Sequence, residues 1–336
     1  MKPGLLAPVW LASLVALTAC TAAPPVNTPA TTASTVSSAQ GETAAVSTTP
    51  TASLAIPADQ FPKLDGSTAN LPLASLLLQR VGGVPKTQAD NLEFATTQKA
   101  YRELASEHES WAANNDTDDD PSAAPEDFPS TLLLAYEPDD DTRQAIADAP
   151  MEFHPIGRDA LVFIANQSNP VDSLTKQQLI DIYTGKTKNW KDVGGKDAAI
   201  TAFQRPEDSG SGALMRKLVM GDNKFAKAPS ELVTESMGGL VEGVASYANT
   251  GSAIGYSVYY YVSQMYDLPG IKVLQADGVA PSNDTIASDQ YPYVNDFYAV
   301  ILADEPADSP ARQLVQYLES PAGKALIAEA GYVPLP

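Results

Sequence analysis

Two segments of the chain place small hydroxyl residues directly before a helix-like stretch, and this arrangement suits an oxyanion. The first is Asp65-Gly66-Ser67-Thr68, and the second runs from Gln204 to Gly212 (QRPEDSGSG). The first turn of a helix has unpaired backbone N–H groups and a partial positive charge, so it attracts anions. Hydroxyl groups add donors, and glycine lets the backbone approach a ligand closely. The candidate donors are therefore Ser67, Thr68, Ser209, Gly210 and Ser211.

Arg205 lies at the start of the second segment, in a chain that is poor in basic residues. Its planar guanidinium can donate several hydrogen bonds to one tetrahedral oxyanion and supplies a full positive charge. A plainer interpretation stays open, because Ser, Thr, Asp and Gly are also the residues preferred for capping a helix. Two such segments together, one of them beside an arginine, favour anion binding without deciding it.

The elements that must position these residues alternate between strands and helices. Strands are expected over residues 130–136, 160–165, 200–203 and 297–302, and helices over 71–81, 97–106, 175–183, 212–220, 311–320 and 322–330. Thr175 is expected to cap the helix that it precedes, and Gly185 to end it. Alternation of this kind predicts an α/β fold with largely parallel sheets.

The composition excludes several classes of protein. The chain has 336 residues with 41 acidic against 21 basic side chains, a net charge of −20, which argues against a nucleic-acid partner. A single cysteine excludes a disulfide scaffold. Two histidines, His108 and His154, leave little material for a metal centre, and we expect no metal or cofactor.

The N-terminus is typical of an exported protein. Residues 1–19 combine Lys2 with a short apolar run and predict a signal peptide, too short to span a bilayer. The run ends in Leu17-Thr18-Ala19-Cys20, which resembles a lipoprotein lipobox, so Cys20 is the expected site of lipidation. Residues 21–55 contain 27 Thr, Ala, Ser or Pro among 35 and predict a disordered tether, which we extend over 20–56.

From Asp65 onward the chain resembles the PstS-like phosphate-binding proteins of phosphate ABC transporters, a group of type II solute-binding proteins. The matching segments are DGSTANLPL (65–73), PIGRDALVFIANQSNPVDSLTKQQLIDIYTGKTKNW (155–190), FQRPEDSGSGALM (203–215), SAIGYSVYYYV (252–262) and YPYVNDFYAVI (291–301). They follow the family order and cover about four fifths of the chain. The resemblance fits the lipobox and the tether.

The resemblance implies a two-lobed type II periplasmic-binding-protein-like fold with the ligand cleft between the lobes. One lobe would comprise residues 57–157 plus 296–336, and the other 158–295. The strands over 160–165 and 297–302 would run side by side near the hinge. The implied function is capture of inorganic phosphate (HPO4²⁻ or H2PO4⁻) by a monomer, tethered by lipid to the bacterial cell membrane on its extracytoplasmic side, for an ABC permease.

Carried over to this sequence, the family site implies that Arg205, Ser209, Gly210 and Ser211 hold the anion, joined by Ser67, Thr68 and Thr97 or its neighbour Thr96. Phosphate binders also place a carboxylate in the site, which accepts a hydrogen bond from protonated phosphate and repels fully ionised sulfate. This sequence departs from the family pattern at that place, where it reads Ala135-Tyr136-Glu137-Pro138. Glu137 is therefore the candidate carboxylate. The alternative interpretation, which stays open, is that Glu137 is an exposed carboxylate at the end of a strand.

Other functions compete with phosphate capture. A binder of another oxyanion or small ligand, or a surface protein for sensing or contacts, would keep the fold. A serine hydrolase or phosphatase fits poorly, because Gly210-Ser211-Gly212 lacks the nucleophile-elbow spacing and neither histidine has a recognisable acid to orient it. We therefore expect no enzymatic activity.

Overall fold

The computed structural model describes residues 54–115, 128–246, 251–266 and 269–336. The signal peptide, Cys20 and most of the predicted tether lie outside the described residues. The described part begins close to its expected start: Ile56 is buried, and its N–H donates to the carbonyl of Val81. Ile56 thus belongs to the folded body, although the tether was predicted to extend to residue 56.

Strands and helices alternate along the chain, as expected. The strands are β1 (Lys63–Gly66), β2 (Thr131–Ala135), β3 (Met151–Asn166), β4 (Ser173–Leu174), β5 (Thr201–Ala202), β6 (Ala253–Val258), β7 (Ile271–Ala276), β8 (Val294–Leu302) and β9 (Val333–Pro334). The helices are α1 (Leu71–Arg80), α2 (Lys86–Ala89), α3 (Thr97–Asn115), α4 (Asp140–Ala145), α5 (Lys176–Tyr183), α6 (Gly210–Met215), α7 (Met237–Ser246), α8 (Asn283–Ala287), α9 (Pro310–Glu319) and α10 (Pro321–Glu329). A π-helical turn, Arg216–Met220, continues α6.

The strands form a mixed sheet, so the expectation of largely parallel pairing was wrong. β1 pairs with β2, β5 with β6, and β4 with β7 in parallel, whereas β2 and β3 pair with β8, and β3 with β6, β7 and β9, in antiparallel fashion. The reason is the long strand β3, which covers 16 residues where the apolar run predicted six. Its first half is only partly buried and carries no continuous apolar signal.

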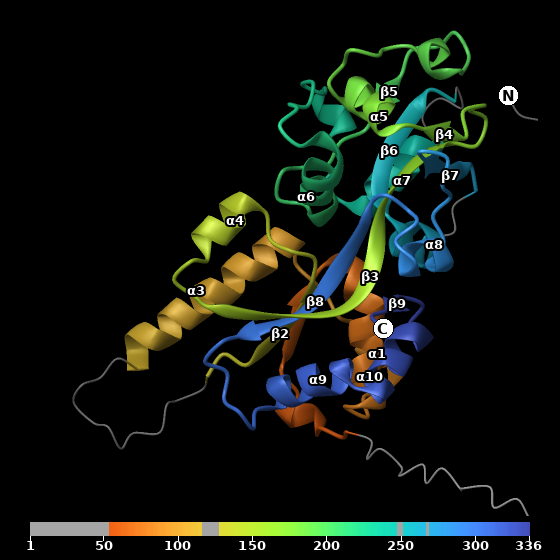
Figure 1. Ribbon diagram of the computed structural model, residues 1–336. Helices are drawn as coiled ribbons and strands as arrows, with labels where there is room; N and C mark the ends of the chain where they lie inside the picture. Colours follow the sequence, from red (N-terminus) through yellow and green to blue (C-terminus); the bar gives the residue numbers. More distant parts are fainter. Residues whose placement is uncertain (1–53, 116–127, 247–250, 267–268) are drawn as a thin grey trace, which may run out of the picture. The chain divides into compact units, whose positions relative to one another are not determined.

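β3 changes its partner along its length (Figure 1). Residues Met151–Ala160 lie against β8, and residues Leu161–Asn166 lie against β6 and β7. The apolar runs 160–165 and 297–302 therefore belong to neighbouring strands but are not opposite one another, because Phe297 pairs with Gly157. The partner change divides the sheet into a part around β1, β2 and β8 and a part around β6 and β7.

Helices cover both faces of the first part of the sheet. All five residues of β2 are buried, as expected for a strand covered on both sides. Leu132 and Leu134 share one cluster with Leu73 and other residues of α1, and Leu133 shares a second cluster with Tyr101 of α3. This alternation is the period of two of a strand, and it fixes which residues at the end of β2 can face the neighbouring elements.

Candidate functional site

A small pocket lies where the two predicted hydroxyl-rich segments meet. Its volume is about 20 Å³, far below the roughly 300–1,000 Å³ of pockets for drug-sized ligands. The lining residues are Ser67, Thr68, Thr96, Thr97, Tyr136, Arg205, Gly210, Ser211, Met237 and Val258. Hydroxyl groups and one guanidinium dominate the lining, so the pocket suits a compact anion of a few heavy atoms.

The first wall of the pocket is the turn that follows β1. Gly66 pairs with Leu134 at a φ of +138°, and an added Cβ would lie 2.0 Å from the carbonyl oxygen of Leu134. Only glycine therefore allows β1 to lie this close to β2 before the chain turns. Ser67 then caps a short 3-10 helix, Thr68–Asn70, by accepting a hydrogen bond from the N–H of Ala69. Ser67 therefore both caps this helix and lines the pocket.

The second wall is the start of α3. Asp65 accepts hydrogen bonds from the N–H of Gly66 at 2.7 Å and from that of Ala95 at 2.8 Å. It thereby ties the end of β1 to the segment that leads into α3. Thr96 and Thr97 follow and line the pocket, and the Oγ1 atom of Thr96 is buried without a hydrogen-bond partner among the described residues. This helix start is a second donor-rich end that faces the same space.

Arg205 supplies the positive charge of the pocket. Arg205 is 9% exposed, and its backbone N–H donates to the hydroxyl of Tyr256 at 3.0 Å. Its Nε and Nη1 atoms are buried and have no partner within the described chain. Burial lowers the pKa of the guanidinium from its ordinary value, which means that the charged form is poorly solvated here. A buried charge of this kind requires a compensating anion.

The third wall is the start of α6. Ser209 is its N-cap: the hydroxyl oxygen accepts from the N–H of Gly212 at 3.1 Å, and the hydroxyl donates to the carbonyl of Pro206 at 2.9 Å. Gly210 packs so closely that an added Cβ would lie 2.6 Å from Oγ1 of Thr97. The hydroxyl of Ser211 lines the pocket, and its buried Oγ has no partner among the described residues.

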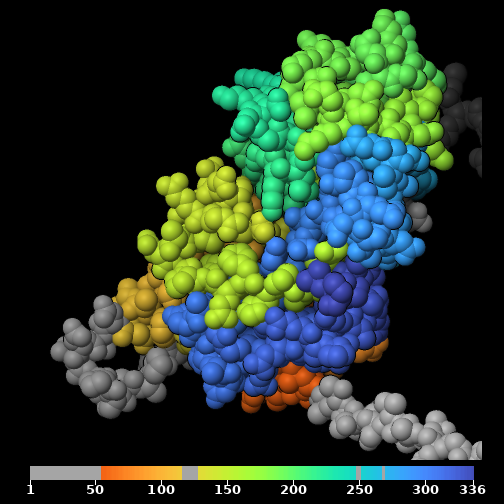
Figure 2. All heavy atoms as spheres, in the orientation of Figure 1, coloured from red at the N-terminus to blue at the C-terminus, as the bar shows by residue number. Residues whose placement is uncertain are grey.

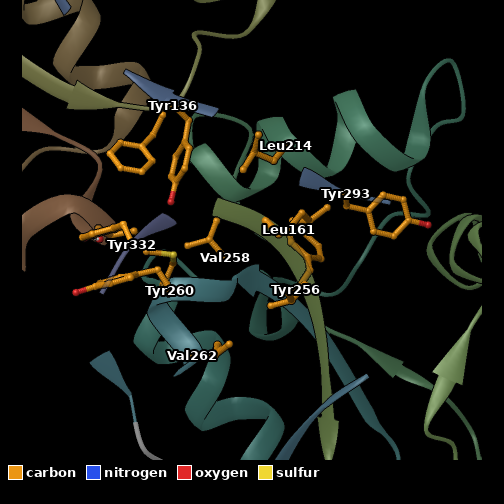
Figure 3. Close-up of a cluster of buried hydrophobic side chains, with 14 of the residues drawn as sticks. Tyr136, Leu161, Leu214, Tyr256, Val258, Tyr260, Val262, Tyr293 and Tyr332 are labelled. Carbon is orange, nitrogen blue, oxygen red and sulfur yellow. Dashed lines mark hydrogen bonds between the residues drawn. The ribbon is translucent and has the colours of Figure 1, made fainter. Parts of the chain in front are cut away.

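The remaining wall combines β6 with the end of β2 (Figure 3). Tyr256 and Val258 lie on one face of β6, since they are two residues apart. Tyr256 holds the backbone of Arg205, and Val258 lines the pocket beside the ring of Tyr136. The hydroxyl of Tyr136 donates to the buried carboxylate of Asp159 at 2.7 Å. This wall thus combines an aromatic and an aliphatic lining residue with hydrogen bonds that fix Tyr136 and the backbone of Arg205.

Comparison with known proteins places the chain in a family. A family profile described as a PBP superfamily domain matches residues 63–329. The chain belongs to this family. It is 32% identical over 180 residues to the phosphate-binding protein PstS of Bacillus subtilis, covering 52% of this chain and 56% of that protein. It is 27% identical over 182 residues to PstS of Borreliella burgdorferi, covering 52% and 63%. The matches thus span less than two thirds of these curated relatives.

Solved structures show the same fold. A substrate-binding protein assigned to a phosphate ABC transporter of Clostridium perfringens, solved with bound phosphate, superposes with a TM-score of 0.61 at 20% identity over 82% of this chain and 99% of that one. An ABC-type phosphate transport receptor of Vibrio cholerae gives 0.56 at 23% identity over 81% and 99%. The two-lobed α/β fold that the resemblance implied is confirmed by these likenesses.

The structure brings together six of the eight predicted ligand-binding residues. Ser67, Thr68, Thr97, Arg205, Gly210 and Ser211 line the pocket. Ser209 caps α6 instead, and Glu137 lies outside the lining. Three lining residues were not predicted from the sequence: Tyr136, Met237 and Val258. Tyr136 directly follows the buried strand β2, shares the cluster of Leu134 and lines the pocket, whereas Glu137, one residue later, does not line it.

Glu137 forms part of a charged bridge beside the pocket, where the segment around residue 140 (yellow in Figure 2) lies next to the segment around residue 220 (blue-green). Its carboxylate accepts a hydrogen bond from Lys217 at 2.6 Å and one from the hydroxyl of Tyr298 at 2.9 Å. Burial acts to raise the pKa of Glu137, but these two hydrogen bonds and the charges of Lys217 and Arg143 together outweigh it and leave the pKa below its ordinary value. The carboxylate is therefore ionised and paired at neutral pH.

Both histidines bond to carboxylates, so the expectation that neither has an acid to orient it was wrong, but neither histidine lines the pocket. His108 bonds to Asp304 at 2.8 Å, and His154 lies between Glu152 and Glu319. Within the described ranges, no three His, Cys, Asp or Glu side chains are grouped as a metal site would need. None of the helices in the described part of the chain has the length and apolar character needed to cross a membrane.

Proposed function

We propose that the protein binds inorganic phosphate outside the cytoplasm and delivers it, as a monomer, to the permease of an ABC importer. The observation that carries the proposal is the guanidinium of Arg205: Arg205 lines a small pocket, and its buried Nε and Nη1 atoms have no partner among the described residues. A tetrahedral oxyanion satisfies such a fork and neutralises its charge. Among the described residues, the pocket lining includes no His, Asp, Glu, Lys or Cys side chain that could act as a base, which supports a role in binding.

The names of the relatives support phosphate as the ligand. The curated relatives are phosphate-binding proteins, and the structure from Clostridium perfringens contains phosphate. The hydroxyl groups of Ser67, Thr68, Thr97 and Ser211 would donate to the oxygens that the guanidinium leaves free.

We further propose that the pocket opens and closes between two lobes, residues 57–157 plus 296–336 and residues 158–295. The change of partner along β3 supports this division, because the pocket takes Ser67 and Tyr136 from one side and Arg205 and Ser211 from the other. Closure would then bring the two sets of donors onto one anion. Attachment to the membrane through a lipid on Cys20 is part of the same proposal.

Isothermal titration calorimetry of the purified protein with phosphate tests the ligand. We expect one site with a Kd in the micromolar range or below. Sulfate titrated under the same conditions distinguishes phosphate capture from general oxyanion binding. Absence of heat and of any thermal shift with both anions would refute the proposal.

A further inference from the structure

A buried carboxylate lies directly behind the pocket. Asp159 is 2% exposed, and its Oδ2 atom accepts a hydrogen bond from the hydroxyl of Tyr136 at 2.7 Å. Its Oδ1 atom accepts from the N–H of Ala160 at 2.8 Å and from that of Tyr260 at 3.0 Å. Asp159 forms no ion pair among those that the described residues make, so hydrogen bonds alone hold its charge.

Asp159 also lies close to the point where β3 changes its pairing partner. Asp159 pairs with Asn295 of β8 near the end of the ladder between β3 and β8. Two residues later, at Leu161, β3 begins to pair with β6. Tyr136 comes from the end of β2, on one side of this change, and Tyr260 follows β6, on the other. One carboxylate therefore joins the two parts of the sheet at the point where they meet.

One of the two residues that Asp159 holds lines the pocket, and the other lies close in sequence to a lining residue. The ring of Tyr136 lines the pocket, and Tyr260 lies two residues after Val258, which lines it too. Figure 3 shows Tyr136 extending toward the stacked rings of Tyr260 and Tyr332, with Val258 beside them. We propose that Asp159 is a positioning residue, which fixes Tyr136 and the end of β6 so that the pocket has the shape its anion requires. The choice of phosphate as probe rests on the function proposed above.

The charge of Asp159 is unfavourable for folding, which argues that it serves binding. Burial raises its pKa to about 6, although the hydrogen bonds from Tyr136, Tyr260 and Ala160 oppose this. An acid whose pKa is raised in the folded state stabilises the fold while it is protonated, and loses that contribution as the pH rises through about 6. A neutral side chain at this position would thus be no worse for stability at pH 7.5.

The groups that face Asp159 do not titrate in the same range. Tyr136 from β2, Tyr260 after β6 and Tyr332 before β9 all have pKa values raised by burial and stay neutral. Asn295 opposite is uncharged, and Arg158 next in the chain pairs with Asp289 and Asp296. A change in binding near pH 6 that depends on residue 159 therefore reports on Asp159 itself.

The test compares the phosphate affinity of the full chain with that of Asp159→Asn and Tyr136→Phe, from pH 5 to pH 8. Tyr291→Phe is the matched control, because it removes another buried hydroxyl, one that donates to the carbonyl of Leu161. At pH 7.5 we expect both site variants to bind at least about tenfold more weakly and the control to match the parent. The ratio between parent and Asp159→Asn should approach one by pH 5. Ionisation of phosphate is common to both proteins and cancels in this ratio.

Hydrogen exchange of the ligand-free proteins supplies a reading that needs no anion. In Asp159→Asn and Tyr136→Phe we expect faster exchange confined to residues 134–136 and 256–260. A ratio that does not change with pH, unchanged affinity, or faster exchange throughout the chain would overturn the proposal. If the parent protein binds no phosphate, the proposed function fails and exchange alone decides the role of Asp159. If Asp159→Asn does not fold, Tyr136→Phe decides it.

Discussion

Lys217 donates a 2.6 Å hydrogen bond to Glu137 and so joins the π-helical turn after α6 to the residue that follows Tyr136. A second pair runs parallel to it, between Arg216 and Asp139 at 3.3 Å. Each pair connects a segment next to Ser211 with a segment next to the end of β2. The carboxylate that the family resemblance assigned to the ligand therefore lies in a bridge across the proposed opening of the pocket.

This bridge predicts a coupling that favours the closed pocket. The side chains of Glu137 and Lys217 are 31% and 52% exposed, so their interaction contributes no more than about 1 kcal/mol. Glu137→Gln, Lys217→Met and the double variant should each weaken phosphate binding by up to about fivefold, with non-additive losses. Calorimetry at low and high salt measures this, and the loss should shrink at high salt. Lys63→Met breaks a comparable 2.7 Å pair with Glu107 away from the bridge and should leave binding unchanged. Additive losses would show that the pair has no such role.

Arg205 predicts opposite effects on binding and on stability. Arg205→Met removes the countercharge of the anion and should weaken phosphate binding by about 3 kcal/mol or more, roughly a hundredfold or more in Kd. It also removes a buried and poorly solvated charge from the ligand-free protein, so the Tm without phosphate should stay the same or rise.

The control for this prediction is Arg80→Met, which breaks the exposed pair with Glu329 and should alter neither quantity. Arg205→Lys keeps the charge and loses the fork, so it should fall between the parent and Arg205→Met. Equal affinity in Arg205→Met and the parent would remove Arg205 from the site.

Gly210 predicts a steric effect at the contact between α6 and α3. In Gly210→Ala the new methyl group would lie 2.6 Å from Oγ1 of Thr97, so either the Thr97 side chain must rotate or one of the two helix starts must move. Because both line the pocket, we expect phosphate affinity to fall by at least about tenfold. In a Thr97→Ala background the same substitution should cost less, since the clashing atom is gone. Equal losses in the two backgrounds would show that the contact does not shape the pocket.

Much of the site could be predicted from the sequence because its local signals are strong. The segment QRPEDSGSG contains an arginine, a cap and glycines before a helix, and the structure places Arg205, Gly210 and Ser211 in the pocket as expected. The turn at Ser67 was found in the same way. These residues can be recognised in the sequence because the start of a helix and an anion-binding site need the same hydrogen-bond donors.

The remaining residues depend on contacts that a local pattern does not contain. Tyr136, Met237 and Val258 are apolar or aromatic residues next to or within buried elements, so in sequence they look like core. The length of β3 was missed because its first half is only partly buried and includes Pro155, which marks an irregularity in the ladder. Asp159 is inconspicuous in the sequence as well, because its partners Tyr136 and Tyr260 are 23 and 101 residues away.

Two serines separated by one residue give the sharpest test of capping against binding. Ser209 accepts from the N–H of Gly212, so Ser209→Ala should lower the free energy of unfolding by about 1 kcal/mol and change phosphate affinity little. The hydroxyl of Ser211 has no partner within the described residues, so Ser211→Ala should leave the ligand-free Tm unchanged. It should weaken phosphate binding by about 1.5–3 kcal/mol, the range for a hydrogen bond to a charged group. Denaturant unfolding and calorimetry on the two variants measure both quantities. The reverse pattern, with Ser209→Ala impairing binding and Ser211→Ala impairing stability, would show that the ligand lies on the other side of α6.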